Sequence, residues 1–134
     1  MPLTRDLCYF KLKEFKHPEL VNETAAELLD EIRAQYGRPL VLTDDARLPG
    51  DQPPGFSPTS LHYKGQAFDL RSRDLTREEM WLLVRAVLSV AEWVARGAKS
   101  GVELEIVSSS TDKHVHIGFF LGDGRKNRIV VRAE

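Results

Sequence analysis

Apolar residues recur along the chain at two different spacings, which predict two helices and several strands. Over residues 18–36 they follow the three- and four-residue spacing of an amphipathic helix, with a proline suited to its first turn. Gly37 is suited to the end of this helix. A longer helix is predicted over residues 76–97, where Thr76 and Glu79 form a capping-box pattern. Both helices are expected to pack an apolar face on one core.

Short apolar or alternating segments elsewhere predict strands, at residues 39–43, 66–70, 102–107, 114–120 and 127–132. The pair Asp123-Gly124 is a hairpin signal and predicts that the last of these strands returns beside the one before it. Residues 48–58 hold four prolines and two glycines, which excludes regular structure and predicts a long loop. The order helix, strands, helix, strands favours an α+β fold with a mostly antiparallel sheet and two main helices.

The composition fits one domain. With 134 residues, of which 42% are apolar, the chain can close a core without disulfides, so residues 1–134 are expected to form a single domain. We expect a monomer. The lone Cys8 has apolar neighbours and is expected to be buried. Trp81 and Trp93 are expected in the core or at its edge, with an exposed aromatic platform as the alternative.

Charge and hydropathy exclude several classes of partner. A formal net charge of -1 lacks the basic surplus that nucleic-acid binding usually requires. No segment approaches the roughly 20 apolar residues of a membrane span, so none is expected. The first residues also lack the pattern of a secretory signal peptide, which predicts synthesis in the cytoplasm.

Three of the four histidines lie in two short motifs that predict a metal site. His62 and Asp69 stand in one motif, and His114 and His116 form the second. A hydrolytic zinc ion takes three nitrogen or oxygen ligands from the protein and leaves a fourth position for water. His62, Asp69 and one histidine of the pair supply that set. Because side chains two residues apart on a strand share a face, the other histidine is expected over the open position.

This arrangement predicts hydrolytic chemistry. Zinc would lower the pKa of its water toward about 7 and polarise a carbonyl group. The second histidine of the pair would take the proton from the water, or stabilise the tetrahedral intermediate and protonate the leaving amine. Arg47 is the candidate cation for a substrate carboxylate or a developing oxyanion. Glu103 and Glu105 alternate with apolar residues, so a solvated strand face is expected for them, with a supporting part at the site as the alternative.

The pattern Ser-x-His-x-x-Gly-x-Ala-x-Asp over residues 60–69, followed by His-x-His over residues 114–116, resembles a family of zinc peptidases. This is the D-alanyl-D-alanine carboxypeptidase and endolysin family, within the group named for lysostaphin, D-alanyl-D-alanine peptidases and sonic hedgehog. The resemblance extends to residues 9–15 and to residues 42–47, where members commonly carry a strand ending in arginine. It implies a hedgehog- or D,D-peptidase-like fold that binds one zinc ion.

The resemblance also implies a role for individual residues. His62, Asp69 and His116 would be the zinc ligands, His114 the catalytic partner, and Arg47 the group that binds substrate or oxyanion. Further candidates for substrate contact, which flank His62 in the motif, are Ser60 and Tyr63.

Two positions depart from the family pattern. Lys113 stands where many relatives have a carboxylate that acts as general base, with Asp112 one residue further away. His114 is therefore expected to take that role, as in the His-x-His branch, with a nearby carboxylate as the alternative. Asp44-Asp45-Ala46 replaces the Ser-Gly-Tyr that often precedes the arginine, which affects the substrate pocket.

The resemblance predicts a zinc-dependent D,D- or L,D-peptidase that hydrolyses peptide bonds next to D-amino acids in peptidoglycan. Both a carboxypeptidase and an endopeptidase of endolysin type, bacterial or phage-encoded, fit the motifs. Peptidoglycan peptides are the expected partner, and the bacterial cell wall or periplasm is the expected site of action. The alternative, favoured by Lys113, is a non-catalytic metal-binding module with the same fold, such as part of a phage particle.

Overall fold

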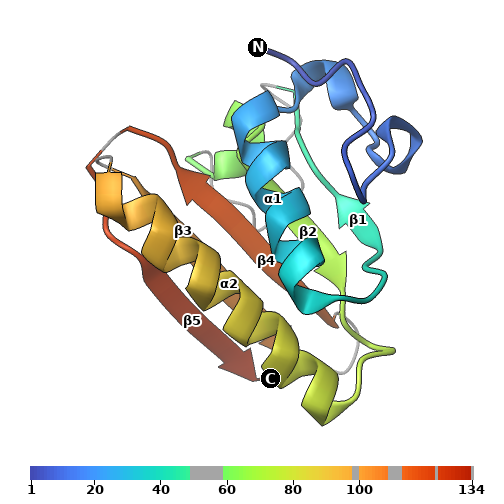
Figure 1. The fold of residues 1–134 in the computed structure, drawn as a ribbon, viewed down its shortest axis with the longest axis vertical. Coiled ribbons are helices and arrows are strands. Elements are labelled where there is room, and N and C mark those ends of the chain that lie inside the picture. Colours follow the sequence, from blue (N-terminus) through green and yellow to red (C-terminus); the bar gives the residue numbers. More distant parts are fainter. Residues whose placement is uncertain (49–58, 98–99, 109–112, 123, 134) are drawn as a thin grey trace.

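A layer of two helices covers one face of a five-stranded sheet (Figure 1). The structure is a computed structural model that describes residues 1–48, 59–97, 100–108, 113–122 and 124–133. The helices are α1 (Glu23–Tyr36) and α2 (Arg77–Gly97). The strands are β1 (Leu42–Asp44), β2 (Ala67–Arg71), β3 (Gly101–Ser108), β4 (Lys113–Phe120) and β5 (Arg128–Ala133). Short 3-10 helices are η1 (Leu12–Glu14), η2 (Pro18–Leu20) and η3 (Leu61–Lys64). The expected α+β class is confirmed.

The first helix starts later than the sequence pattern predicts. The predicted start at Pro18 is wrong, because η2 ends at Leu20 and the chain is extended at Val21. The α-helix begins only after Asn22, whose side-chain oxygen accepts a hydrogen bond from the backbone N–H of Ala25 at 3.0 Å. An asparagine in this position satisfies a helix donor that would otherwise lack a partner. The predicted end at Gly37 is confirmed by its left-handed conformation (φ 80°).

The capping box of α2 is confirmed. Glu79 Oε1 accepts a hydrogen bond from the backbone N–H of Thr76 at 3.0 Å, and Thr76 Oγ1 accepts one from that of Glu79 at 3.1 Å. These reciprocal bonds satisfy free backbone donors and fix where the helix begins.

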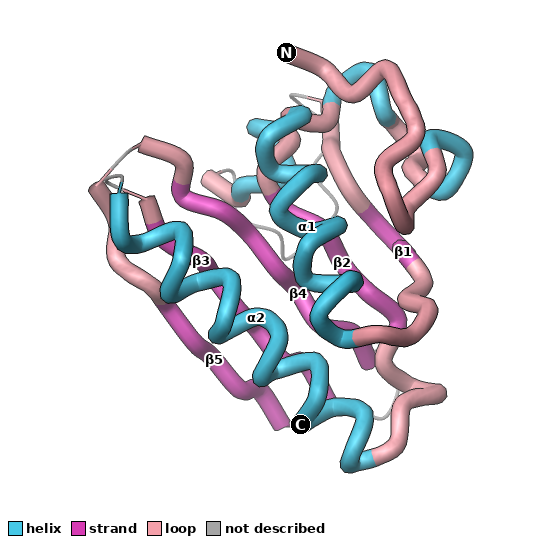
Figure 2. Tube along the Cα trace, viewed as in Figure 1, coloured by secondary structure: helices cyan, strands magenta, loops and turns pink. Residues whose placement is uncertain are grey.

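The sheet is mixed, with strand order β1-β2-β4-β3-β5 (Figure 2). The pairings β1–β2, β2–β4 and β3–β4 are antiparallel, whereas β3–β5 is parallel. The predicted hairpin between the last two strands is therefore wrong, and Asp123 itself lies outside the described residues. Because β2 and β3 occupy both edges of β4, the last strand pairs with the open edge of β3 instead.

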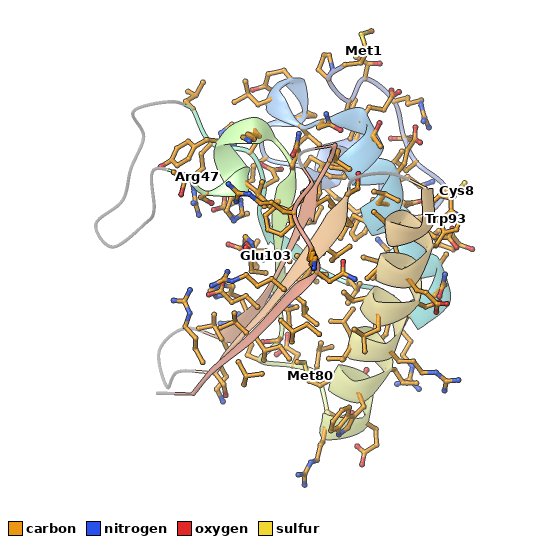
Figure 3. All side chains as sticks on the ribbon, turned by 90° about the vertical axis from the view of Figure 1, so that its left-hand side faces the viewer. Met1, Cys8, Arg47, Met80, Trp93 and Glu103 are labelled. Atoms are coloured by element: carbon orange, nitrogen blue, oxygen red, sulfur yellow. The ribbon has the colours of Figure 1, made fainter. Side chains whose placement is uncertain are left out.

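Alternation along the strands gives the sheet two different faces. Phe68 on β2, Ile117 on β4 and Leu104 on β3 are fully or almost fully buried in the main core, together with the apolar sides of both helices. Asp69 and His116 alternate with these residues and so point to the opposite face. Figure 3 shows the labelled Glu103 on that side of the sheet, away from α2. The polar candidates therefore lie on the face that the helices leave uncovered.

Three apolar or weakly polar residues are more exposed than predicted. Cys8 is exposed, because its neighbours Leu7 and Phe10 take the core positions of that segment. Trp81 and Trp93 are 68% and 64% exposed, so their assignment to the core or its edge is wrong. The buried stripe of α2 is narrower than the sequence suggests and consists of Leu83, Ala86, Val87, Val90 and Ala91.

Among the described residues, no helix combines the length and apolar character needed to cross a membrane.

The close approach of Gly65 to the backbone of Leu20 predicts that a larger residue at this position lowers stability. Gly65 ends η3 with φ 68°, and a Cβ atom there would lie 2.0 Å from the backbone oxygen of Leu20. Gly65→Ala is expected to lower the free energy of unfolding by clearly more than the roughly 1–2 kcal/mol of a left-handed alanine. Gly37→Ala is the matched control, because Gly37 has φ 80° but no atom within 4 Å of its added Cβ. Equal losses for both variants in urea unfolding would contradict the proposed close approach.

Candidate metal centre

Three elements bring three potential ligands together. His62 lies on η3, a turn that begins where the Ser60 hydroxyl accepts a hydrogen bond from the His62 backbone N–H at 3.3 Å. The turn ends at Gly65 in the left-handed conformation. Asp69 on β2 is directly paired with His116 on β4 in the antiparallel register. Paired residues on neighbouring strands direct their side chains to the same face, so the register itself places the carboxylate beside the imidazole.

The three side chains have the spacing of ligands around one ion. His62 Nε2 lies 3.3 Å and His116 Nδ1 lies 3.1 Å from Asp69 Oδ1. All ligand atoms of the group lie within 4.8 Å of one another, and all three residues are buried. Ligand atoms held tetrahedrally at zinc distances would be roughly 3.3–3.6 Å apart. This group, predicted from the sequence, can hold a metal ion.

His62 is oriented by backbone groups of the segment that follows β1. Its Nδ1 atom lies 2.5 Å from the backbone oxygen of Asp45, and its own carbonyl accepts a hydrogen bond from the Arg47 backbone N–H at 2.9 Å. Because Nδ1 carries the proton in this contact, Nε2 is the nitrogen that faces Asp69 and that would bind a metal ion after losing its own proton. Asp45 is itself buried and accepts a hydrogen bond from the Lys16 backbone N–H at 2.6 Å, which fixes its place.

His116 is oriented by Glu103, a side chain expected on a solvated strand face, with a supporting part at the site as the alternative. Its Nε2 atom lies 2.8 Å from Glu103 Oε1, and Glu103 Oε2 lies 3.0 Å from Arg128 Nη1. The assignment of Glu103 and Glu105 to a solvated strand face is therefore wrong. Glu105 is paired with His116 in the β3–β4 register, is only 8% exposed and forms an ion pair with Arg132. Glu103 and Glu105 would alternate with apolar residues on a solvated face and on a face that holds a site. The sequence pattern therefore does not distinguish these two roles.

A second group of donors shares one of the same histidines. Glu103, Glu105 and His116 also bring ligand atoms within 4.8 Å of one another. Both of these carboxylates are already ion-paired, with Arg128 and Arg132 respectively. The arginine charges oppose a further cation there, so the group of His62, Asp69 and His116 is the better metal site.

The pKa values of three side chains at the centre are shifted in the direction that favours their charged forms. Burial alone would raise the pKa of Asp69, but hydrogen bonds and positive charge from His116 and His62 hold it well below its ordinary value. Burial alone would lower the pKa of His116, but Asp69 and Glu103 together raise it to about 9. The hydrogen bond from His116 and the nearby Arg128 lower the pKa of Glu103. A metal ion must therefore displace a proton that two carboxylates stabilise.

The remaining predicted residues lie on the elements that carry the ligand candidates or, for Arg47, on the segment that follows β1. Arg47 is buried, and its Nη2 atom lies 2.6 Å from Asp44 Oδ2; Figure 3 shows it on the same side of the sheet as Glu103. His114 is half-buried on β4, on the same face as His116. Tyr63 is half-buried on η3. The described residues thus unite the three ligand candidates, while contact of Arg47, His114 or Tyr63 with a substrate stays a prediction.

Of the two residues considered at the position of the usual carboxylate base, Lys113 and Asp112, the structure describes Lys113. Lys113 is exposed at the first position of β4, and Asp112 lies outside the described residues. The sequence motif that named His62, Asp69 and His116 gave no signal for Asp45 or Glu103. Their contacts depend on strand pairing and on a backbone carbonyl, which a linear pattern does not encode.

The chain matches no protein-family model, and neither curated proteins nor solved structures give a significant match to it. The likeness to the zinc peptidases therefore rests on the motif residues of the sequence alone.

The raised pKa of His116 predicts that the free energy of unfolding depends on pH. The proton on His116 stabilises the chelator-treated fold fully below the ordinary histidine pKa of 6.5, and this contribution is lost as the pH rises through about 9. We expect the free energy of unfolding to fall over this range by up to about 1.4 kcal/mol per pH unit. Urea titrations from pH 6 to 9.5 measure it, with His116→Gln as the control that lacks this proton. Identical pH profiles for the two proteins would contradict the ion pair.

Proposed function

We propose that this protein is a zinc-dependent peptidase that hydrolyses peptide bonds next to D-amino acids in peptidoglycan. The observation that carries the proposal is the grouping of His62, Asp69 and His116: their ligand atoms lie within 4.8 Å of one another, and Asp69 Oδ1 lies 3.3 Å from His62 Nε2 and 3.1 Å from His116 Nδ1. These are the residues that the family motif names as zinc ligands. Two imidazoles and one carboxylate are a usual ligand set for a catalytic zinc, which keeps one position open.

The donor chemistry fits zinc in particular. The hydrogen bonds at the far ring nitrogens of His62 and His116, to the Asp45 carbonyl and to Glu103, are those that zinc-binding histidines commonly make. Zinc bound there supplies Lewis-acid chemistry, making water a stronger acid and polarising a carbonyl group. Other metals also prefer nitrogen and oxygen ligands, and the metal analysis described below distinguishes them from zinc.

His114 and Arg47 are the proposed catalytic residues. A ring nitrogen of His114, on the same face as His116, accepts a proton from the attacking water and later donates it to the leaving amine. The guanidinium of Arg47 binds a substrate carboxylate or the oxyanion of the tetrahedral intermediate. Asp44 holds this guanidinium at 2.6 Å and so sets its direction. Ser60 caps the turn that carries His62, and Tyr63 on that turn is the further candidate for substrate contact.

The substrate class is supported by the motif resemblance. Both a carboxypeptidase and an endopeptidase of endolysin type fit it, acting at the cell wall or in the periplasm. The second candidate function is a non-catalytic metal-binding module with the same fold. The exposed Lys113, at the position of the usual carboxylate base, favours that second function.

Metal analysis combined with mass spectrometry of peptidoglycan fragments tests the proposed function. We expect about one zinc per chain and release of a D-amino acid or of a cut stem peptide, both abolished by a chelator and restored by zinc. Zinc binding without any cleavage would favour the non-catalytic module. Cleavage that persists in chelated protein would contradict the zinc peptidase.

The two histidines of β4 are predicted to have separable roles. His116→Ala is expected to abolish stoichiometric zinc binding, since it removes a ligand from a three-residue site. His114→Ala serves as the matched control on the same strand and should retain zinc while turnover falls by about 10²–10⁴. Elemental analysis and a peptidoglycan-release assay on both variants measure this. Equal zinc loss in both variants would mean that the pair is assigned incorrectly.

Arg47 is predicted to act on turnover rather than on metal binding. Arg47→Ala should lower kcat by about 10²–10³, the usual effect of removing an oxyanion-stabilising group, with zinc content unchanged. Arg38→Ala is the control, because Arg38 is exposed and pairs with Glu79 at the start of α2. Unchanged kinetics in Arg47→Ala would remove Arg47 from the mechanism.

A further inference from the structure

Glu103 contacts a proposed zinc ligand at a nitrogen that the metal would not use. We propose that Glu103 is a positioning residue that fixes the ring of His116 with Nδ1 toward the metal, an inference that rests on the proposed zinc centre. Glu103 belongs to β3, outside both sequence motifs, and its contact comes from the pairing of β3 with β4.

The two nitrogens of His116 face different partners. Nδ1 lies 3.1 Å from Asp69 Oδ1, within the ligand group, whereas Nε2 lies 2.8 Å from Glu103 Oε1. A carboxylate at Nε2 keeps the proton on that nitrogen, which leaves the lone pair of Nδ1 for a metal ion. Both nitrogens face a carboxylate, but only Nδ1 lies within the ligand group, so a metal ion bound there would take the place of the proton between His116 and Asp69. The alternative tautomer would place its lone pair against the Glu103 carboxylate, on the side of the ring away from that group. Glu103 thereby selects which nitrogen binds.

Glu103 is itself held in place. Arg128 on β5 is paired with Glu103 in the parallel β3–β5 register, and its Nη1 atom lies 3.0 Å from Oε2. The Glu103 side chain is only 15% exposed, so solvent competes little for its oxygens. One oxygen therefore binds the arginine while the other binds His116. This connects the last strand of the sheet to the metal centre.

The same geometry argues against two other roles for Glu103. The nitrogens of an imidazole point away from each other, so a group that bonds Nε2 lies on the far side of the ring from a metal at Nδ1. From that side Glu103 does not reach a water on the metal, which excludes it as general base in this conformation. Its ion pair with Arg128, and that of Glu105 with Arg132, also leave these carboxylates poorly suited to bind a cation of their own.

Zinc affinities of Glu103 variants test the inference. By competition with a chromophoric chelator, Glu103→Ala is expected to bind zinc about 10- to 100-fold more weakly than wild type, as is usual for such supporting carboxylates. Glu103→Gln keeps an oxygen that accepts the Nε2 proton and should recover part of the affinity. Glu105→Gln is the matched control, a buried carboxylate two residues along the same strand, and should bind zinc as wild type does.

Histidine nitrogen NMR on the zinc-loaded proteins supplies a readout that a general loss of stability would not change. In wild type, His116 should show metal at Nδ1 and a slowly exchanging proton at Nε2; in Glu103→Ala that slow proton should be lost. Wild-type affinity and an unchanged pattern in Glu103→Ala would overturn the inference while leaving the zinc centre intact. Equal weakening in Glu105→Gln would overturn it in favour of the second donor group. A wild-type protein that binds no zinc would instead remove the proposed function and this inference with it.

Discussion

The pairing of β2 with β4 is the constraint on which the candidate centre depends. It places Asp69 directly opposite His116 on the face of the sheet that the helices leave uncovered. A shift of one residue would turn the carboxylate into the core and bring Leu70, an apolar residue, to its place. The burial of Phe68 and Leu70 on the other face opposes such a shift. The hydrophobic core thus fixes a polar arrangement that would be unfavourable to form alone.

The centre is built from charged groups that support one another. A buried carboxylate between two imidazoles is stable only if its partners are well placed, because desolvation otherwise outweighs the attraction. Here the partners are fixed from outside the group, His62 by the Asp45 carbonyl and His116 by Glu103. Such preorganisation suits a site that must hold an ion without rearranging.

Local patterns predicted much of this molecule, and non-local contacts account for the rest. The capping box at Thr76, the end of α1 at Gly37 and the grouping of His62 with Asp69 each depend on residues close in sequence. The partner of β5 depends instead on which strand edge is already occupied, and the contact of Glu103 depends on the resulting sheet order. Likewise, Trp93 follows the helical apolar pattern, but the neighbouring elements do not cover it.

Diffraction from zinc-loaded crystals, measured on both sides of the zinc absorption edge, would locate the metal ion and its ligands. We expect one anomalous peak, bound by His62 Nε2, Asp69 Oδ1 and His116 Nδ1 at about 2.0–2.2 Å, with an oxygen from solvent in the fourth position. A peak bound instead by Glu103, Glu105 and His116 Nε2, or no peak between His62 and Asp69, would contradict it.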